Sequence, residues 1–188
     1  MVGVAAIWEA VSQGGYVLVV VPTKALAMQW IGVIRSNLPR LSIGQVGDGH
    51  KDSFDTHQVV VGTVQSLSRK PVISRSLTLV IADEVHRYGA SKWSKAFLDN
   101  YKWRLGLTAT YERVGDSGVE DFLNPYFSKT VFSYQYAEAL KDGVVAPFNL
   151  AFIGLDFSLQ ERLKYEDCVE RADRARKRLL TEFDYEPD

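Results

Sequence analysis

Two adjacent carboxylates, Asp83 and Glu84, directly follow the apolar run 80–82. An acidic pair at the end of a strand can serve phosphoryl transfer. One carboxylate can hold the magnesium ion that bridges the terminal phosphates, while the other orients the attacking water. Asp83 suits the metal and Glu84 the water. The pair can also simply begin a helix, since Asp and Glu favour helix starts, so the pair alone leaves both interpretations open.

Hydroxyl side chains follow three other apolar runs. Thr108 and Thr110 come after the run 103–107, where their hydroxyls can bond to the polar group around Asp83 and His86. Two further stretches each place hydroxyls and free backbone N–H groups at a helix start directly after a strand, an arrangement that binds phosphates. Each stretch taken singly is explained more simply as a helix cap or turn. The two stretches are Pro22-Thr23-Lys24 and Gly62-Thr63-Val64-Gln65-Ser66.

The apolar runs that precede these polar residues predict a sheet. They are near-continuously apolar rather than alternating, which is typical of strands buried on both faces. A helix is expected before the first run, at 2–12, and another between runs, at 26–37, with a short further strand at 42–46. This alternation predicts an α/β domain in which a mostly parallel sheet lies between two layers of helices. Ligands gather at the carboxyl ends of such strands, where all four polar stretches lie. The main strands are expected at 16–21, 58–62, 77–82 and 103–107.

The pattern changes after residue 112. Further strands are expected at 131–133 and 149–155, and a charged helix with scattered apolar residues at 158–183. We therefore expect one domain over residues 1–157, followed by a helical linker or extension over 158–188.

The composition excludes several classes of protein. The 188 residues are 46% hydrophobic, enough for one well-filled domain. Lys and Arg number 22 against 23 Asp and Glu, a net charge of -1, so any contact with nucleic acid has to be local. Cys168 is the only cysteine, which excludes an internal disulfide and a cysteine-rich zinc site. No apolar run approaches the roughly 20 residues of a membrane span, so we expect a cytoplasmic protein with no membrane partner.

Taken in order, the four polar stretches resemble the motifs of superfamily two helicases. Pro22-Thr23-Lys24 resembles motif Ia, Gly62-Thr63-Val64-Gln65-Ser66 motif Ib, Asp83-Glu84-Val85-His86 motif II and Thr108-Ala109-Thr110 motif III. Their order and spacing match over residues 1–112. The segment 104–113 is similar to the DNA-repair and type III restriction branch, although Tyr111 stands where many relatives have proline. The stretch 136–147 extends the likeness to about residue 165.

The resemblance implies a RecA-like P-loop NTPase fold and the first motor domain of an ATP-dependent DNA or RNA helicase. ATP and Mg²⁺ would be its cofactors, with Asp83 on the metal and Glu84 on the hydrolytic water. His86 would couple the nucleotide to the nucleic acid through Thr108 and Thr110. The branch favours single- or double-stranded DNA over RNA. The residues expected to contact one strand's backbone are Pro22, Thr23, Lys24, Thr63, Gln65 and Ser66.

Helicases of this kind also use a Gly-x-Gly-Lys-Thr type loop to hold the phosphates, and the 188 residues contain none. In relatives that loop directly precedes the helix that here begins at Met1. We therefore expect a chain that starts just after its first strand and loop, that lacks a second RecA-like domain, and that is inactive alone. A non-catalytic nucleic-acid-binding remnant of a helicase is the alternative. Another α/β hydrolase with Asp83 and Glu84 as metal ligands is a third interpretation.

Overall fold

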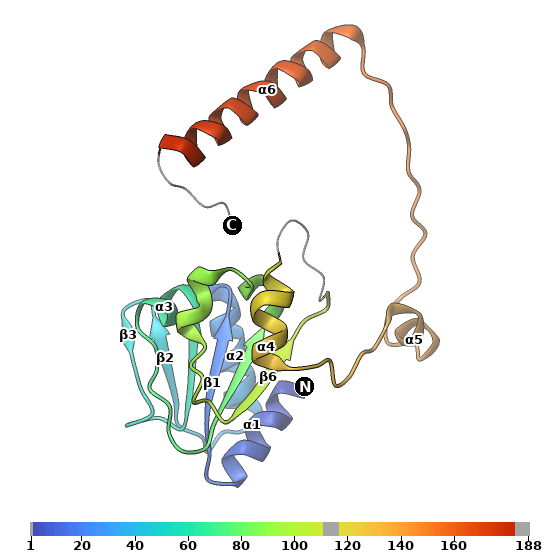
Figure 1. Ribbon diagram of the computed structural model, residues 1–188. Helices are drawn as coiled ribbons and strands as arrows, with labels where there is room; N and C mark the ends of the chain where they lie inside the picture. The colour runs from blue at the N-terminus through green and yellow to red at the C-terminus, as the bar shows by residue number, and fades with distance from the viewer. Residues whose placement is uncertain (1, 111–116, 183–188) are drawn as a thin grey trace. The chain divides into compact units, whose positions relative to one another are not determined.

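Five strands that run in one direction and one short strand that runs against them form a single sheet. The strand order is β3-β2-β4-β1-β5-β6, and only the pairing of β3 with β2 is antiparallel (Figure 1). This confirms the predicted mixed α/β fold with a mostly parallel sheet. The strands are β1 (Tyr16–Val21), β2 (Ile43–Gly47), β3 (His50–Lys51), β4 (Val59–Thr63), β5 (Thr78–Asp83) and β6 (Trp103–Leu107).

The computed structural model describes residues 2–110 and 117–182. Internal contacts divide the chain into two units, Met1–Thr130 and Val131–Asp188, and the sheet belongs to the first. The helices of the first unit are α1 (Val2–Ser12), α2 (Lys24–Asn37), α3 (Val64–Arg69) and α4 (Asn124–Phe127), with the 3-10 helices η1 (Val85–Tyr88) and η2 (Ser91–Ala96) and the π-helix η3 (Val119–Leu123). The second unit contains α5 (Tyr136–Lys141) and α6 (Leu159–Glu182).

The central strand β1 explains why the sheet needs helices on both faces. Successive side chains of a strand point to opposite faces, and β1 is buried from Val17 to Val21. Val17, Val19 and Val21 belong to the core that includes α1 and α2. Leu18 and Val20 belong to the core that includes α3, η1, η2, η3 and α4. The predicted three-layer arrangement is therefore confirmed, and it accounts for the near-continuous apolar runs.

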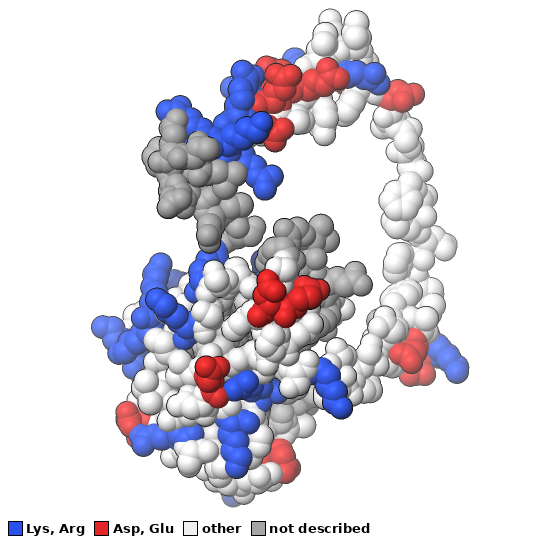
Figure 2. Space-filling model, viewed as in Figure 1, with Lys and Arg blue, Asp and Glu red and all other residues white. Residues whose placement is uncertain are grey.

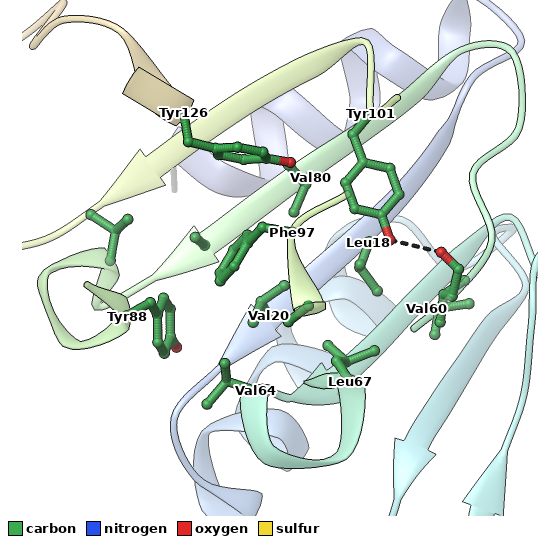
Figure 3. Close-up of a cluster of buried hydrophobic side chains, with 14 of the residues drawn as sticks. Leu18, Val20, Val60, Val64, Leu67, Val80, Tyr88, Phe97, Tyr101 and Tyr126 are labelled. Carbon is green, nitrogen blue, oxygen red and sulfur yellow. Dashed lines mark hydrogen bonds between the residues drawn. The ribbon is translucent and has the colours of Figure 1, made fainter. Parts of the chain in front are cut away.

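The core on the α3 side is rich in aromatic rings. Phe97 packs against Tyr88 and Tyr126, with ring centroids 5.5 and 5.6 Å apart. Tyr101 is only 1% exposed and donates its hydroxyl to the backbone oxygen of Val72 at 2.7 Å (Figure 3). Burial raises the pKa of Tyr101, so the hydroxyl stays protonated and keeps donating. This bond fixes the loop that follows α3 against the segment that leads into β6.

Two of the predicted strands are absent from the second unit. Residues 131–133 and 149–155 are described but form no strand, so this prediction was wrong. Their large apolar side chains are exposed, with Phe132 at 76% and Phe152 at 89%. A strand needs a neighbour for its backbone hydrogen bonds, and neither segment pairs with another strand in the described part of the chain. The predicted long helix is confirmed as α6, while the domain boundary at residue 157 stays a prediction.

Residues 50–51 form the short strand β3, which the sequence did not predict. Among the described residues, no helix has the length and apolar character that crossing a membrane requires.

A close backbone contact next to η1 provides a test of the packing. A Cβ atom added to Gly89 would lie 2.9 Å from the Cα of Gly118, whereas one added to Gly32 on α2 meets nothing within 4 Å. We predict that Gly89→Ala lowers the free energy of unfolding by about 1–3 kcal/mol, because backbone atoms have no room to yield. Gly32→Ala should raise it by about 0.5–1 kcal/mol, since alanine favours a helix interior. Urea unfolding followed by circular dichroism measures both, and equal effects would contradict the described contact.

Candidate functional site

The end of β5 places the acidic pair at the carboxyl edge of the sheet. Asp83 is the last residue of β5 and lies opposite Leu107, the last residue of β6. Glu84 then adopts a left-handed backbone, with φ 54° and ψ 46°, before η1 begins. A non-glycine residue in this region costs on the order of 1 kcal/mol, and such residues cluster at functional sites. The turn is held by Tyr88, whose hydroxyl donates to the backbone oxygen of Asp83 at 2.7 Å.

Asp83 accepts two hydrogen bonds that fix its carboxylate. The indole Nε1 of Trp30 donates to Oδ2 at 2.7 Å, and the backbone N–H of Glu84 donates to Oδ1 at 3.1 Å. Trp30 and Asp83 also line a cavity of about 340 Å³ beside Gly3 at the start of α1. Sequence analysis predicted the helix that contains Trp30 but missed this bond. The available signal was the indole N–H itself, because a partly buried Trp usually needs an acceptor.

The donor set at this edge suits a magnesium ion that a nucleotide shares. Mg²⁺ is usually held by one or two carboxylates together with phosphates and water. Among residues 2–110 and 117–182, no three His, Cys, Asp or Glu side chains gather into a metal site. A single oriented carboxylate, such as that of Asp83, fits an ion whose other ligands come from the nucleotide and from water.

His86 links the end of β5 to the end of β6. Its Nδ1 lies 2.7 Å from Oγ1 of Thr108 and 3.4 Å from Oε2 of Glu84. The Thr108 hydroxyl donates to the backbone oxygen of Thr110 at 2.6 Å and accepts from the backbone N–H of Thr110 at 3.1 Å. Because its only hydrogen is used on Thr110, Thr108 has to accept from His86, so the His86 Nδ1 carries a hydrogen. The structure thus brings together four of the five predicted catalytic side chains, while Thr110 contributes backbone atoms.

The helix starts that follow β1 and β4 lie at the same edge, because β1 pairs in parallel with β4 up to Val21 and Thr63. The Thr23 hydroxyl caps α2 by accepting from the N–H of Leu26 at 3.3 Å. The Thr63 hydroxyl caps α3 by accepting from the N–H of Ser66 at 3.4 Å and donates to the Ser66 hydroxyl at 3.0 Å. The predicted helix starts are confirmed, and their contact with nucleic acid stays a prediction.

Two side-chain contacts connect these helix starts with their surroundings. Gln65 donates through Nε2 to the backbone oxygen of Pro22 at 3.5 Å, which joins the start of α3 to the end of β1. Lys24 forms an ion pair with Asp48 at 2.5 Å between side chains that are 69% and 60% exposed. Through this hydrogen bond and its charge, Lys24 lowers the pKa of Asp48. An anion that binds Lys24 therefore shares or competes for the ammonium group with Asp48, a partner that sequence analysis did not predict. Tyr111 lies outside the described residues.

Comparison with known proteins identifies similar chains. The family model described as "Type III restriction enzyme, res subunit" matches residues 1–113. An uncharacterised protein of Mycobacterium tuberculosis is 33% identical over 146 residues, which cover 70% of this chain and 24% of that protein. A protein of Halobacterium salinarum, named Rad25 and described as a candidate DNA 3'-5' helicase, is 34% identical over 117 residues, 60% of this chain and 19% of that protein.

Among solved structures, the Sulfolobus solfataricus SWI2/SNF2 ATPase core in complex with dsDNA is 19% identical, with a TM-score of 0.47 over 57% of this chain and 24% of that chain. The chain spans about a quarter of the length of the first of the curated relatives it matches. The family model covers more than half of the chain, on the part that contains the sheet and every predicted site residue. The chain therefore belongs to the family of the type III restriction enzyme res subunit, as a superfamily two helicase-like N-terminal domain.

Proposed function

We propose that the chain is part of an ATP-dependent helicase or translocase that acts on DNA in preference to RNA. The observation that carries this proposal is the position of His86, whose Nδ1 bonds to Oγ1 of Thr108 and lies 3.4 Å from Oε2 of Glu84. His86 thereby connects the acidic end of β5, which suits a nucleotide and Mg²⁺, to the end of the neighbouring strand β6. The family match supports the helicase-like part, and the naming of one relative as a candidate DNA helicase supports DNA.

In this proposal the residues of β5 and η1 divide the chemistry between them. Asp83 would hold Mg²⁺, which neutralises charge on the terminal phosphates when it is bound. Glu84 would position the hydrolytic water, because it directly follows Asp83 on the fixed turn. His86 would report the occupancy of this site to Thr108 and Thr110 through a bond that is already made.

The nucleic acid would run over the starts of α2 and α3. Pro22, Thr23 and Lys24 on one start and Thr63, Gln65 and Ser66 on the other present hydroxyls, an ammonium group and backbone N–H groups. Such groups contact phosphate and sugar and carry no information about base sequence. We therefore propose binding along one strand without sequence preference.

Hydrolysis by a chimaeric protein tests the proposed reaction. We predict negligible ATP hydrolysis by the 188-residue chain, because it contains no Gly-x-Gly-Lys-Thr sequence to hold the phosphates. Joining it to that loop and to the second motor domain of a relative should give hydrolysis that single-stranded DNA stimulates. Glu84→Gln should then lower kcat about 100-fold or more, through loss of the group that orients the water.

Glu9→Gln is the matched control, because Glu9 lies exposed on α1 and should leave the rate unchanged. A chimaera that binds single strands but hydrolyses no ATP would favour the non-catalytic alternative. A Glu84→Gln chimaera that keeps its full rate would refute the role of Glu84.

The bond from Trp30 to Asp83 makes a second prediction. Trp30→Phe keeps most of the packing but removes the donor that orients Oδ2 of Asp83. Loss of a group that orients a metal ligand typically weakens metal binding about 10-fold or more. In the chimaera, we therefore expect the Mg²⁺ concentration for half-maximal hydrolysis to rise by that factor.

The fluorescence of Trp30 provides a readout independent of turnover. It should change when Mg²⁺ and a non-hydrolysable ATP analogue bind, and the change should vanish in Trp30→Phe. Trp8→Phe is the control, since Trp8 is 59% exposed on α1 and lies outside the cavity that Asp83 lines. Equal Mg²⁺ dependence in the two variants would contradict a positioning role for Trp30.

A further inference from the structure

A groove larger than the cavity at Asp83 lies on the first unit, next to the start of α3. Its volume is about 770 Å³, and it is lined by the β2–β3 turn, the loop that leads to β4, the end of α3 and the loop 70–75. None of its basic residues belongs to the strand-end site described above. The charges that line it are therefore not explained by the proposed function.

Three cations of this groove form no ion pair within the described part of the chain. Lys51 on β3, Arg69 at the end of α3 and Lys70 after it are all exposed. Across residues 2–110 and 117–182, their side chains make no hydrogen bond or ion pair. Figure 2 shows Lys and Arg side chains gathered over β3 and α3. In a chain whose net charge is -1, such a gathering is a local positive field.

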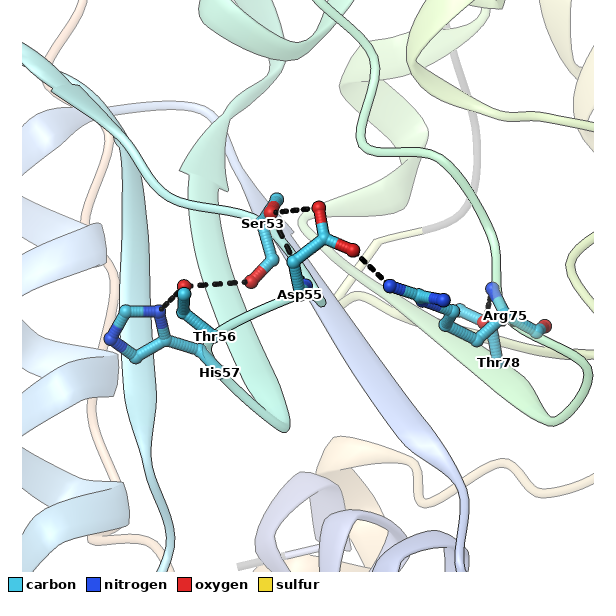
Figure 4. Close-up of polar contacts among 6 residues, drawn as sticks. All are labelled: Ser53, Asp55, Thr56, His57, Arg75 and Thr78. Atoms are coloured by element: carbon cyan, nitrogen blue, oxygen red, sulfur yellow. Dashed lines mark hydrogen bonds and ion pairs between the residues drawn. The ribbon is translucent and has the colours of Figure 1, made fainter.

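The two acids of the groove are already engaged. Asp55 forms an ion pair with Arg75 and accepts from the hydroxyl of Ser53 at 2.9 Å (Figure 4). Asp52 accepts at 2.9 Å from the backbone N–H of Gln45 on β2. Against these two carboxylates, four cationic side chains line the groove, which are Lys51, Arg69, Lys70 and Arg75. The groove therefore presents an excess of positive charge to an incoming anion.

The groove is continuous with the start of α3. Ser66, which bonds to Thr63 in the cap of α3, also lines the groove. Gly47 lies against it so closely that an added Cβ would stand 2.6 Å from the Ser66 hydroxyl, and the φ of Gly47 is +108°. The floor is apolar, with Phe54 and Val72 buried beneath it. A ligand bound at the start of α3, at Thr63 and Ser66, can thus extend into the groove, because Ser66 lines both.

We propose that this groove binds the phosphodiester backbone of a single nucleic-acid strand, with Lys51, Arg69 and Lys70 each contacting a phosphate. This inference rests on the proposed function, because the same strand first passes over the start of α3. A single nucleic-acid strand is flexible and carries a negative charge on each phosphate. Successive phosphates can therefore pair with the three cations that line this open groove. Such contacts are independent of base sequence and depend strongly on salt.

The test is the binding of a fluorescein-labelled oligothymidylate to the full 188-residue chain, followed by anisotropy over a series of salt concentrations. One variant combines Lys51→Gln, Arg69→Gln and Lys70→Gln. Its matched control combines Arg35→Gln, Arg40→Gln and Lys129→Gln, which removes the same charge from exposed positions outside the groove. All six positions are exposed, so both variants should fold, and circular dichroism checks that they do.

Each phosphate contact on a single strand contributes about 0.7 to the slope of log K against log salt. Loss of three contacts should lower the slope by about 2 and weaken binding roughly 100-fold at 0.1 M salt, while the control stays close to the unaltered chain. If the groove variant and the control weaken equally, only net charge matters and the groove proposal is overturned while the proposed function stands. If the unaltered chain binds no oligothymidylate, both the groove proposal and the proposed nucleic-acid binding fall.

Discussion

The parallel pairing of β1 with both β4 and β5 is the constraint on which the site depends. Val20 of β1 lies opposite Gly62 on one side and Ala82 on the other. The carboxyl ends of all three strands therefore reach the same edge, and the polar residues that follow them meet there. The side-chain period of a strand is two, so a slip of one residue would turn each strand's buried side chains to the opposite face. The observed register, with Val20 opposite both Gly62 and Ala82, therefore sets the positions of Thr63 and Asp83 at this edge.

The sequence predicted this part of the molecule well for a physical reason. A strand buried on both faces has to be apolar at almost every position, so the runs 16–21 and 77–82 could hardly be placed elsewhere. Strands were also expected at 131–133 and 149–155, yet these segments form no strand and their apolar side chains are exposed. Apolar character indicates only that a segment favours burial. It does not indicate whether another strand is present to pair with that segment.

The contacts that sequence analysis missed join residues distant in the chain. Trp30 and Asp83 are 53 residues apart, and Lys24 and Asp48 are 24 apart. No local spacing rule connects such pairs, because they meet only when α2 packs on the sheet and β2 joins β4. The excess positive charge of the groove could not be predicted from the sequence either. It arises because the fold gathers four cations and only two carboxylates in one groove, and the net charge of -1 gives no sign of that.

The hydroxyl of Thr108 connects His86 to Thr110 with all of its hydrogen-bonding capacity in use. A threonine hydroxyl has one hydrogen to donate and two lone pairs to accept with, and here Thr110 and His86 use all three. No further group can bond to it without displacing one of these two partners. A shift of His86 that followed a change at Glu84 would therefore free an acceptor position on Thr108. Coupling between two sites requires an element with two discrete arrangements. In the proposed function, the bond between His86 and Thr108 is the element whose made and broken states would provide those two arrangements.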